Sequence, residues 1–247
     1  MANEFIIALA GSILSTPDAI GFAWRALCLV YWLLATMRSF WDDHDTKLGF
    51  VVTTVTLREL VALPITYLHY NGLAVVAIKF VHQILLCALL FLVHNMSEKQ
   101  MSRMSLRHRV CYALLVENCV AYNMTWNYVQ TSTLLAALLV QDFGVGPDTV
   151  STLLLVLLAI CVLATVSVEL VFLNKLRWTA AGHFPIQMWV YYLYQGSVLD
   201  GRMVWILLVT NALLVIIKFT PEKCKYHRCV AERMEEEDSD ENLLVEV

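Results

Sequence analysis

Six charged residues lie within long apolar segments of this sequence, where a charge is costly and is therefore a candidate for function. Three are basic and three are acidic: Arg25, Arg58, Lys79, Glu59, Glu117 and Glu169. Charged side chains inside a membrane usually face the bundle interior or water, and they mark ion, proton or solute pathways. The balanced set predicts a buried polar network, which either lines a transport path or holds helices together as ion pairs.

Arg58 and Glu59 are adjacent, so on one helix their side chains point about 100° apart and each needs a partner elsewhere. A tight Asn-Gly turn at 71–72 makes the apolar segments on either side of it antiparallel neighbours. Glu59 then lies level with His82 and close to Lys79, and we expect it to pair with one of them. His82 is also the member of this group that titrates near neutral pH.

Polar residues in other apolar segments extend the same candidate path. Glu117, the expected partner of Arg58, is followed by Asn118 and, one turn later, by Asn123. Trp189 belongs to an aromatic-rich segment and is the candidate for an aromatic lining of the path. These residues must be positioned by the elements that the composition predicts.

The composition is that of a membrane protein. Of the 247 residues, 59% are hydrophobic and 15% are charged, whereas a soluble domain averages about 45–50% apolar and about 25% charged residues. Several apolar runs reach roughly the 20 residues needed to cross a hydrocarbon core of about 30 Å, and no alternating period indicates strands. We therefore expect an all-α polytopic membrane protein, a bundle of seven transmembrane helices. The seven predicted helices are residues 18–36, 48–69, 73–94, 110–131, 149–173, 181–198 and 203–219.

Basic residues orient the predicted bundle, because Lys and Arg accumulate in cytoplasmic loops. Among the basic residues in the loops, in the tail and at the end of the last predicted helix, only Arg202 falls on one side of the membrane. The basic residues on the other side are Arg38, Lys47, Lys99, Arg103, Arg107, Arg109, Lys175, Arg177, Lys218, Lys223, Lys225, Arg228 and Arg233. This asymmetry predicts an outside or lumenal N-terminus and a cytoplasmic C-terminus. A further crossing at 131–140 would destroy it, so that stretch is either an extension of the fourth helix or a separate interfacial element.

Three regions divide the predicted chain. Residues 1–17 form an interfacial N-terminal segment, 18–219 the membrane domain, and 220–247 an acidic, disordered cytoplasmic tail. Cys224 and Cys229 follow the last helix and are candidates for lipidation, with free thiols as the alternative. The tail could also bind a sorting partner or a PDZ-like groove, with solubility alone as the alternative.

No motif for metal or nucleophilic chemistry occurs in the sequence. It contains no HExxH and no Gly-x-Ser-x-Gly, so we expect no enzyme, no metal and no cofactor. A retinal photoreceptor would need a lysine at mid-depth of the last helix. That position holds Asn211, which we add to the candidate path, while Lys218 lies at the cytoplasmic end.

Two segments share a pattern that suggests an internal repeat. Residues 64–72 read PITYLHYNG and residues 185–196 read PIQMWVYYLYQG. If both cross the membrane in the same direction, the chain is a parallel 3+1+3 repeat, a theme of transporters. That arrangement resembles the SWEET and KDEL-receptor class, although the two segments differ in spacing by three residues and the Pro-Gln dipeptide of that class is absent.

The sequence thus predicts a transporter or channel for a small polar solute, a proton or an ion, integral to the plasma membrane or an endomembrane. Its expected partners are the lipid bilayer, the transported species and, at the tail, a sorting or PDZ-like protein. A homo-oligomer is compatible with this prediction, and nucleic acid is not expected. The alternative is a receptor-like or assembly subunit whose buried charges are structural and whose tail binds partners.

Overall fold

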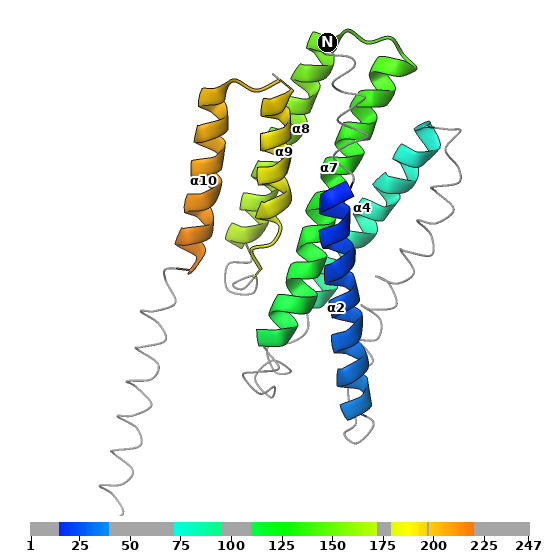
Figure 1. The fold of residues 1–247 in the computed structure, drawn as a ribbon, viewed down its shortest axis with the longest axis vertical. Coiled ribbons are helices and arrows are strands. Elements are labelled where there is room, and N and C mark those ends of the chain that lie inside the picture. The colour runs from blue at the N-terminus through cyan, green and yellow to red at the C-terminus, as the bar shows by residue number, and fades with distance from the viewer. Residues whose placement is uncertain (1–14, 40–71, 95–109, 172–178, 197, 220–247) are drawn as a thin grey trace, which may run out of the picture. The chain divides into compact units, whose positions relative to one another are not determined.

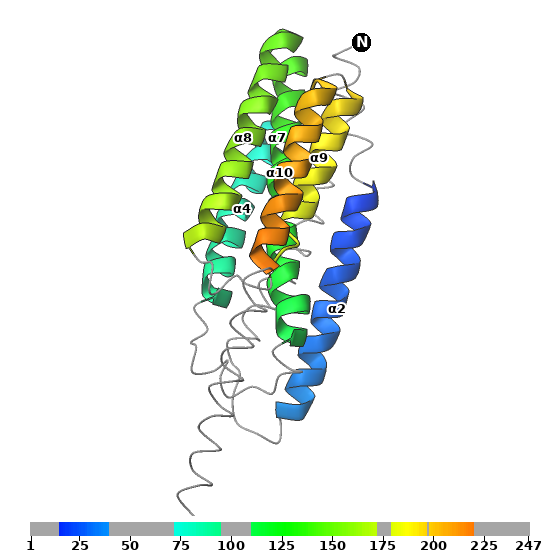
Figure 2. The same cartoon turned by 90° about the vertical axis from the view of Figure 1, so that its left-hand side faces the viewer.

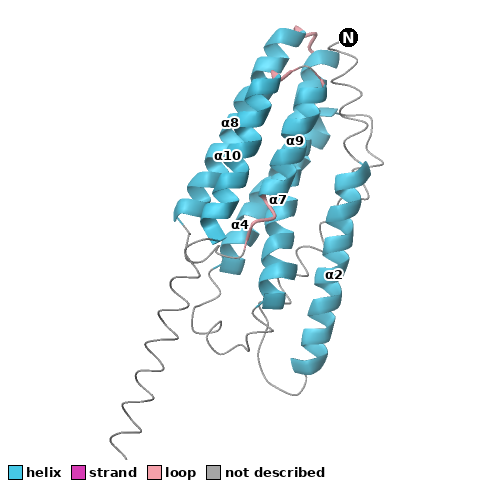
Figure 3. Cartoon of the chain, turned by 60° about the vertical axis from the view of Figure 1, so that its left-hand side comes forward, coloured by secondary structure: helices cyan, strands magenta, loops and turns pink. Residues whose placement is uncertain are grey.

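The computed structural model describes residues 15–39, 72–94, 110–171, 179–196 and 198–219, and every regular element in these ranges is a helix (Figures 1 and 3). The elements in chain order are α2 (Ser15–Ser39), α4 (Gly72–His94), η1 (Ala113–Glu117), α7 (Asn118–Gln141), α8 (Pro147–Val171), α9 (His183–Gln195) and α10 (Gly201–Phe219). The predicted all-α class is confirmed for this part of the chain.

Most predicted helix positions that fall within the described ranges are close to the observed ones. Helices α2, α4, α8, α9 and α10 coincide within a few residues with the predicted segments 18–36, 73–94, 149–173, 181–198 and 203–219. The predicted helix at 48–69 and the predicted tail at 220–247 lie outside the described residues. At the N-terminus, α2 already begins at Ser15, so Pro17 lies in its first turn, where a missing N–H is tolerated.

The fourth predicted helix is longer than its predicted end at residue 131. Helical residues 110–112 lead through the π-helical turn η1 into α7, which continues without a break to Gln141. Residues 131–140 are therefore an extension of this helix, which settles the alternative that the sequence left open. At about 1.5 Å per residue, residues 110–141 span about 48 Å, more than the roughly 30 Å of a hydrocarbon core.

Helix α7 is the helix around which the others pack. It contacts α4, α8, α9 and α2 (Figure 2). Its contacts form two apolar clusters. One joins α7 to α8 and α9 around Trp126, Trp189 and Leu154, and the other joins α2, α4 and the start of α7 around Cys28, Leu89 and Val116. Burial on several sides explains why α7 has few exposed residues, whereas α4 and α8 have many.

Two of the described helices are long and apolar enough to cross a membrane. They are Gly72–Phe91 within α4 and Pro147–Val168 within α8, and only 17% and 22% of these stretches are buried. The exposed side chains of α4 include Phe80, Val81 and Ile84. Contiguous exposed apolar faces of this kind mark contact with lipid or protein, since water disfavours them. These helices support a membrane location.

The chain divides into two compact units, Met1–Leu208 and Val209–Val247. The boundary falls within α10, whose first residues, 201–208, belong to the first unit. All contacts considered below lie inside the first unit.

Candidate functional site

Three amide side chains of α7 form a buried polar face. Asn123, Asn127 and Gln130 are four and three residues apart, so they lie one above another on the same side of the helix. Their side chains are 2%, 0% and 5% exposed. A buried polar group left without a hydrogen bond costs about 1–3 kcal/mol, so this face requires polar partners on neighbouring helices.

Helix α4 supplies partners for Asn127 and Gln130. Lys79 Nζ donates to Gln130 Oε1 at 2.8 Å, and His82 Nδ1 lies 3.0 Å from Asn127 Oδ1. Asn127 Nδ2 donates to the backbone carbonyl oxygen of Lys79 at 3.1 Å and to Gln83 Oε1 at 2.9 Å. Because Lys79 and His82 are three residues apart, they share a face of α4 and meet the amide row of α7 in register.

Helix α2 contributes a carboxylate to the same network. Asp18 lies in the first turn of α2, where the helix dipole favours negative charge. Its Oδ1 accepts hydrogen bonds from Trp126 Nε1 at 2.7 Å and from Gln130 Nε2 at 2.8 Å. The Tyr122 hydroxyl donates to the carbonyl oxygen of Pro17 at 3.0 Å. These bonds join the first turn of α2 to two turns of α7.

Further along α2, Arg25 makes a second attachment. Its Nη1 donates to Asn123 Oδ1 at 2.6 Å, and Asn123 Nδ2 donates to the Cys119 carbonyl oxygen at 2.7 Å. Gly21 lies between the two attachments. A Cβ atom at Gly21 would lie 3.3 Å from Tyr122 Cε1 and 3.4 Å from Asn123 Oδ1. The glycine therefore allows the close approach of α2 to α7 that the Arg25–Asn123 bond needs.

Gln130 links two opposite charges through one neutral amide. Its oxygen accepts from the Lys79 ammonium, and its nitrogen donates to the Asp18 carboxylate. Hydrogen bonds with an ionised partner are shorter and stronger than neutral ones. We call the whole set the α7 polar network; its members are Asp18, Arg25, Lys79, His82, Gln83, Asn123, Asn127 and Gln130.

Glu117 and Asn118 hold a different segment. Thr179 Oγ1 donates to Glu117 Oε2 at 3.1 Å, and the Asn118 Oδ1 atom accepts from the backbone N–H groups of Ala180 and Ala181, each at 2.9 Å. Glu117 is 2% exposed. The two residues thus fasten the chain just before α9 to the start of α7.

The π-helical turn η1 places this pair. Its extra residue per turn interrupts the α-helical hydrogen bonds, and the Asn118 side chain stabilises it by donating Nδ2 to the Ala113 carbonyl oxygen at 2.8 Å. Trp24 of α2 donates Nε1 to the Leu114 carbonyl oxygen at 3.1 Å within the same turn. Single π turns are frequent at functional sites, so this turn is a feature to test.

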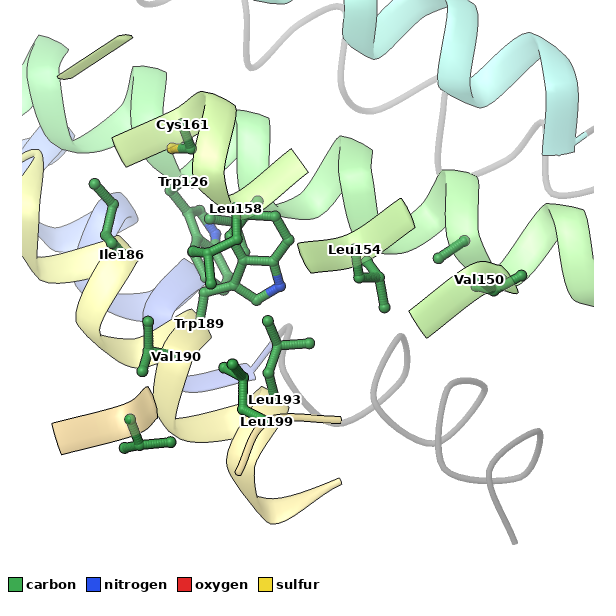
Figure 4. Close-up of a cluster of buried hydrophobic side chains, with 14 of the residues drawn as sticks. Trp126, Val150, Leu154, Leu158, Cys161, Ile186, Trp189, Val190, Leu193 and Leu199 are labelled. Atoms are coloured by element: carbon green, nitrogen blue, oxygen red, sulfur yellow. The ribbon is translucent and has the colours of Figure 1, made fainter. Parts of the chain in front are cut away.

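Four of the candidate residues from the sequence belong to the α7 polar network of the structure. They are Arg25, Lys79, His82 and Asn123. Trp189 instead lies in the apolar cluster with Trp126, Leu154 and Leu158, where it is 0% exposed (Figure 4). Its Nε1 has no acceptor among the described residues.

Several predicted residues are not placed beside the network. Arg58, Glu59, Cys224 and Cys229 lie outside the described residues, and with them the predicted pairings of Glu59 with His82 or Lys79 and of Arg58 with Glu117. Glu169 belongs to α8, but its side chain is not described. Asn211 is a buried residue of α10 in the second unit.

Sequence reasoning missed Asp18 and Gln130 as members of the network. Asp18 follows a proline and is the first residue of the predicted helix 18–36, so it was not included among the charges within the apolar segments. A signal for Gln130 was nevertheless present, because it lies seven residues after Asn123 and thus on the same helical face.

Within the described ranges, no group of three or more His, Cys, Asp or Glu side chains could hold a metal ion. No known protein family, curated protein or solved structure matches this chain. Arguments about its function therefore depend on the geometry of the α7 polar network and on the faces of the helices around it.

Proposed function

We propose that this chain is a seven-helix membrane protein that moves a proton, an ion or a small polar solute along the polar face of α7. The observation that supports the proposal most is the α7 polar network, in which three buried amides of α7 are hydrogen-bonded to partly buried ionisable side chains from α2 and α4. Beside it, α4 presents an apolar outer face. Ionisable groups inside a membrane protein are costly, and a path for a polar solute is a common reason to retain them.

The direction of the helices is compatible with alternate crossings. Asp18 contacts Gln130, whereas Arg25, later in α2, contacts Asn123, earlier in α7. Helix α2 therefore runs antiparallel to α7, and the α4 contacts described above have the same order. Since α2 and α4 then run in the same direction, two crossings by them require a return crossing in between, where the sequence predicts the helix at 48–69.

Helix α9 runs in the same direction as α7. Glu117 contacts Thr179, and Tyr128, later in α7, packs its ring against Trp189, later in α9, with ring centroids 6.2 Å apart. Two parallel helices are expected if α8 crosses back between them. The proposed orientation, with the N-terminus outside, then places the turn at 142–146 outside as well.

A glycosylation acceptor tests this orientation. A loop with an Asn-x-Thr sequon inserted at Gly144, a residue with a positive φ of 62° in an exposed turn, should be glycosylated in a eukaryotic membrane. The same loop inserted between residues 95 and 109 should not be modified. The reverse pattern would overturn the proposed orientation.

Flux through liposomes tests the transport activity itself. The purified protein should support movement of protons, Na⁺, K⁺, Cl⁻ or a small polar solute, and His82→Ala and Glu59→Gln should reduce the rate about tenfold or more. Thr152→Ala is a matched control, because that hydroxyl is exposed and donates to the Asp148 carbonyl oxygen of its own helix.

A second candidate function is that of an assembly subunit whose buried charges only hold helices together. The observation that favours it is that the amides of the α7 polar network are already well supplied with hydrogen bonds, as a purely structural network requires. Wild-type protein that moves none of the species above, while remaining folded, would favour this candidate.

A further inference from the structure

The orientation of one amide determines where the proton of neutral His82 resides. Asn127 Nδ2 lies 3.1 Å from the backbone carbonyl oxygen of Lys79, which can only accept a hydrogen bond, so the amide nitrogen must face it. Asn127 Oδ1 then faces His82 Nδ1 at 3.0 Å. Because this oxygen also can only accept, the proton of neutral His82 is on Nδ1, and Nε2 retains the lone pair.

We propose that His82 is the proton-binding residue of the α7 polar network and that it takes up the proton on Nε2. Asn127 is the positioning residue: by accepting the hydrogen bond from Nδ1, it keeps Nε2 of the neutral ring unprotonated. The inference rests on the proposed function and names the proton as the species that the site binds. Binding forms one N–H bond at Nε2 with a proton from water and converts the imidazole to an imidazolium. No bond other than that of the proton donor is broken, and no electron is transferred.

The contact between His82 and Asn127 is the same in both charge states. Nδ1–H donates to Asn127 Oδ1 whether the ring is neutral or protonated. Helices α4 and α7 therefore remain joined while the proton arrives and leaves. A site that must be loaded and emptied repeatedly benefits from a fixed ring position, because each cycle then needs no repacking.

The charges around His82 come from three helices. On α4, Lys79 lies one turn before His82 and disfavours a second positive charge beside it. Gln130 of α7 connects Lys79 to the carboxylate of Asp18 on α2, which offsets that charge. Arg25 of α2 is bound to Asn123, one turn of α7 away from Asn127.

The expected pairing with Glu59 would add a negative charge next to the ring. It would stabilise the protonated form of His82.

Nitrogen NMR of the full-length protein in lipid bilayers tests the inference directly. With ¹⁵N-labelled histidine, the chain gives signals from seven residues, and His82→Gln identifies those of His82. In alkaline buffer we expect a protonated Nδ1 and a bare Nε2, and in acidic buffer both nitrogens protonated. A bare Nδ1 in alkaline buffer, or a ring that stays neutral throughout, overturns the inference.

Two variants test the role of Asn127. Asn127→Leu should allow both neutral tautomers of His82, because it removes the oxygen that faces Nδ1. Gln83→Leu is the matched control: it removes one partner of Asn127 but leaves the Lys79 carbonyl oxygen that orients the amide, so the Nδ1–H tautomer should persist. An unchanged tautomer in Asn127→Leu overturns the positioning role.

A flux measurement separates this inference from the proposed function. Liposomes with a pH gradient should show proton movement with the wild type and at least a tenfold loss with His82→Gln. Absence of proton movement by the folded wild type overturns the role of His82 in transport, while movement of another ion would leave the proposed function standing. The NMR result decides the tautomer independently of either outcome.

Discussion

Helix α7 has two buried faces that are held in opposite ways. The face toward α8 and α9 packs Trp126 and neighbouring apolar residues against Trp189 and Leu154. The face toward α2 and α4 packs an apolar cluster at the start of α7, but from Asn123 to Gln130 it carries amides bonded to charged side chains. Apolar packing depends mainly on buried area and volume, whereas a polar face depends on each donor finding its acceptor.

Trp126 belongs to both faces. Its ring is part of the apolar cluster, while its Nε1 donates to Asp18 at 2.7 Å. It therefore marks the border at which one kind of packing changes to the other. The comparison teaches that burial alone does not distinguish the two faces, since both contain side chains with almost no exposed surface. What distinguishes them is their tolerance of substitution, which the following predictions address.

The largest effect is expected on the apolar face. Trp189→Ala should reduce the free energy of unfolding by about 3–5 kcal/mol, because it leaves a cavity in a tightly packed cluster. Unfolding in detergent, followed by circular dichroism, measures the loss. Trp189→Phe should cost less than about 2 kcal/mol, because the indole N–H has no described acceptor to lose. Equal losses of unfolding free energy for the two variants would contradict the view that side-chain volume determines the stability of this face.

Asp18→Ala should have the next largest effect, on the polar face. It leaves Trp126 Nε1 and Gln130 Nε2 without their acceptor. Because Asp18 is only partly buried, water can replace part of this acceptor, and the total loss should be about 2–3 kcal/mol. The same unfolding measurement applies. Asp18→Asn keeps an acceptor oxygen and should recover at least half of the loss. An alanine variant as stable as the wild type would mean that this attachment of α2 contributes nothing.

A double-mutant cycle on Lys79 and Gln130 should give a smaller but specific effect. Lys79→Met and Gln130→Met together should be less damaging than the sum of the single changes, with a coupling energy of about 1 kcal/mol or more. Pairing Lys79→Met with Thr165→Ala of α8 is the control and should be additive, because that hydroxyl bonds to its own helix. Additivity in both cycles would deny a direct Lys79–Gln130 interaction.

The smallest effect is expected for Thr133→Val. The Thr133 hydroxyl donates to the Val129 carbonyl oxygen of its own helix. This oxygen also accepts a backbone hydrogen bond within the helix, so it still has a donor after the change. The free energy of unfolding should change by less than about 1 kcal/mol. A loss as large as that of Asp18→Ala would show that buried polar atoms of α7 behave alike on every face.

The apolar pattern was enough to predict most of the helices. Long hydrophobic runs such as 73–94 determine helix positions by themselves. In an apolar environment the backbone N–H and C=O groups of such a run must form hydrogen bonds with each other, and a helix achieves this within one segment. The pattern could not determine the end of the fourth helix. Residues 131–140 are apolar in either alternative, and only packing along the whole of α7 distinguishes them.

The candidate site was predictable in part. Charge within apolar segments singled out Arg25 and Lys79 without any structure, because such residues need an explanation wherever they occur. His82 was selected for its expected position beside Glu59 and for its ability to titrate near neutral pH. Their partners were harder to predict, since an uncharged amide such as Gln130 gives no comparable signal. The bridge from Lys79 to Asp18 depends on the register of three helices, which a single sequence does not contain.

The π turn at Ala113–Glu117 has a consequence for how this helix tolerates changes in length. It takes one residue more than a regular turn, so deleting one residue there would allow an uninterrupted α-helix. Because the wide turn already takes up this extra residue, the helix before the deletion and the helix after it would keep nearly the same phase. Tyr112, now 3% exposed, would stay in its cluster, and α7 would keep its polar network. A deletion within the regular part of α7 would instead rotate its two ends by about 100° relative to each other, so the π turn is the place where this helix tolerates the loss of one residue.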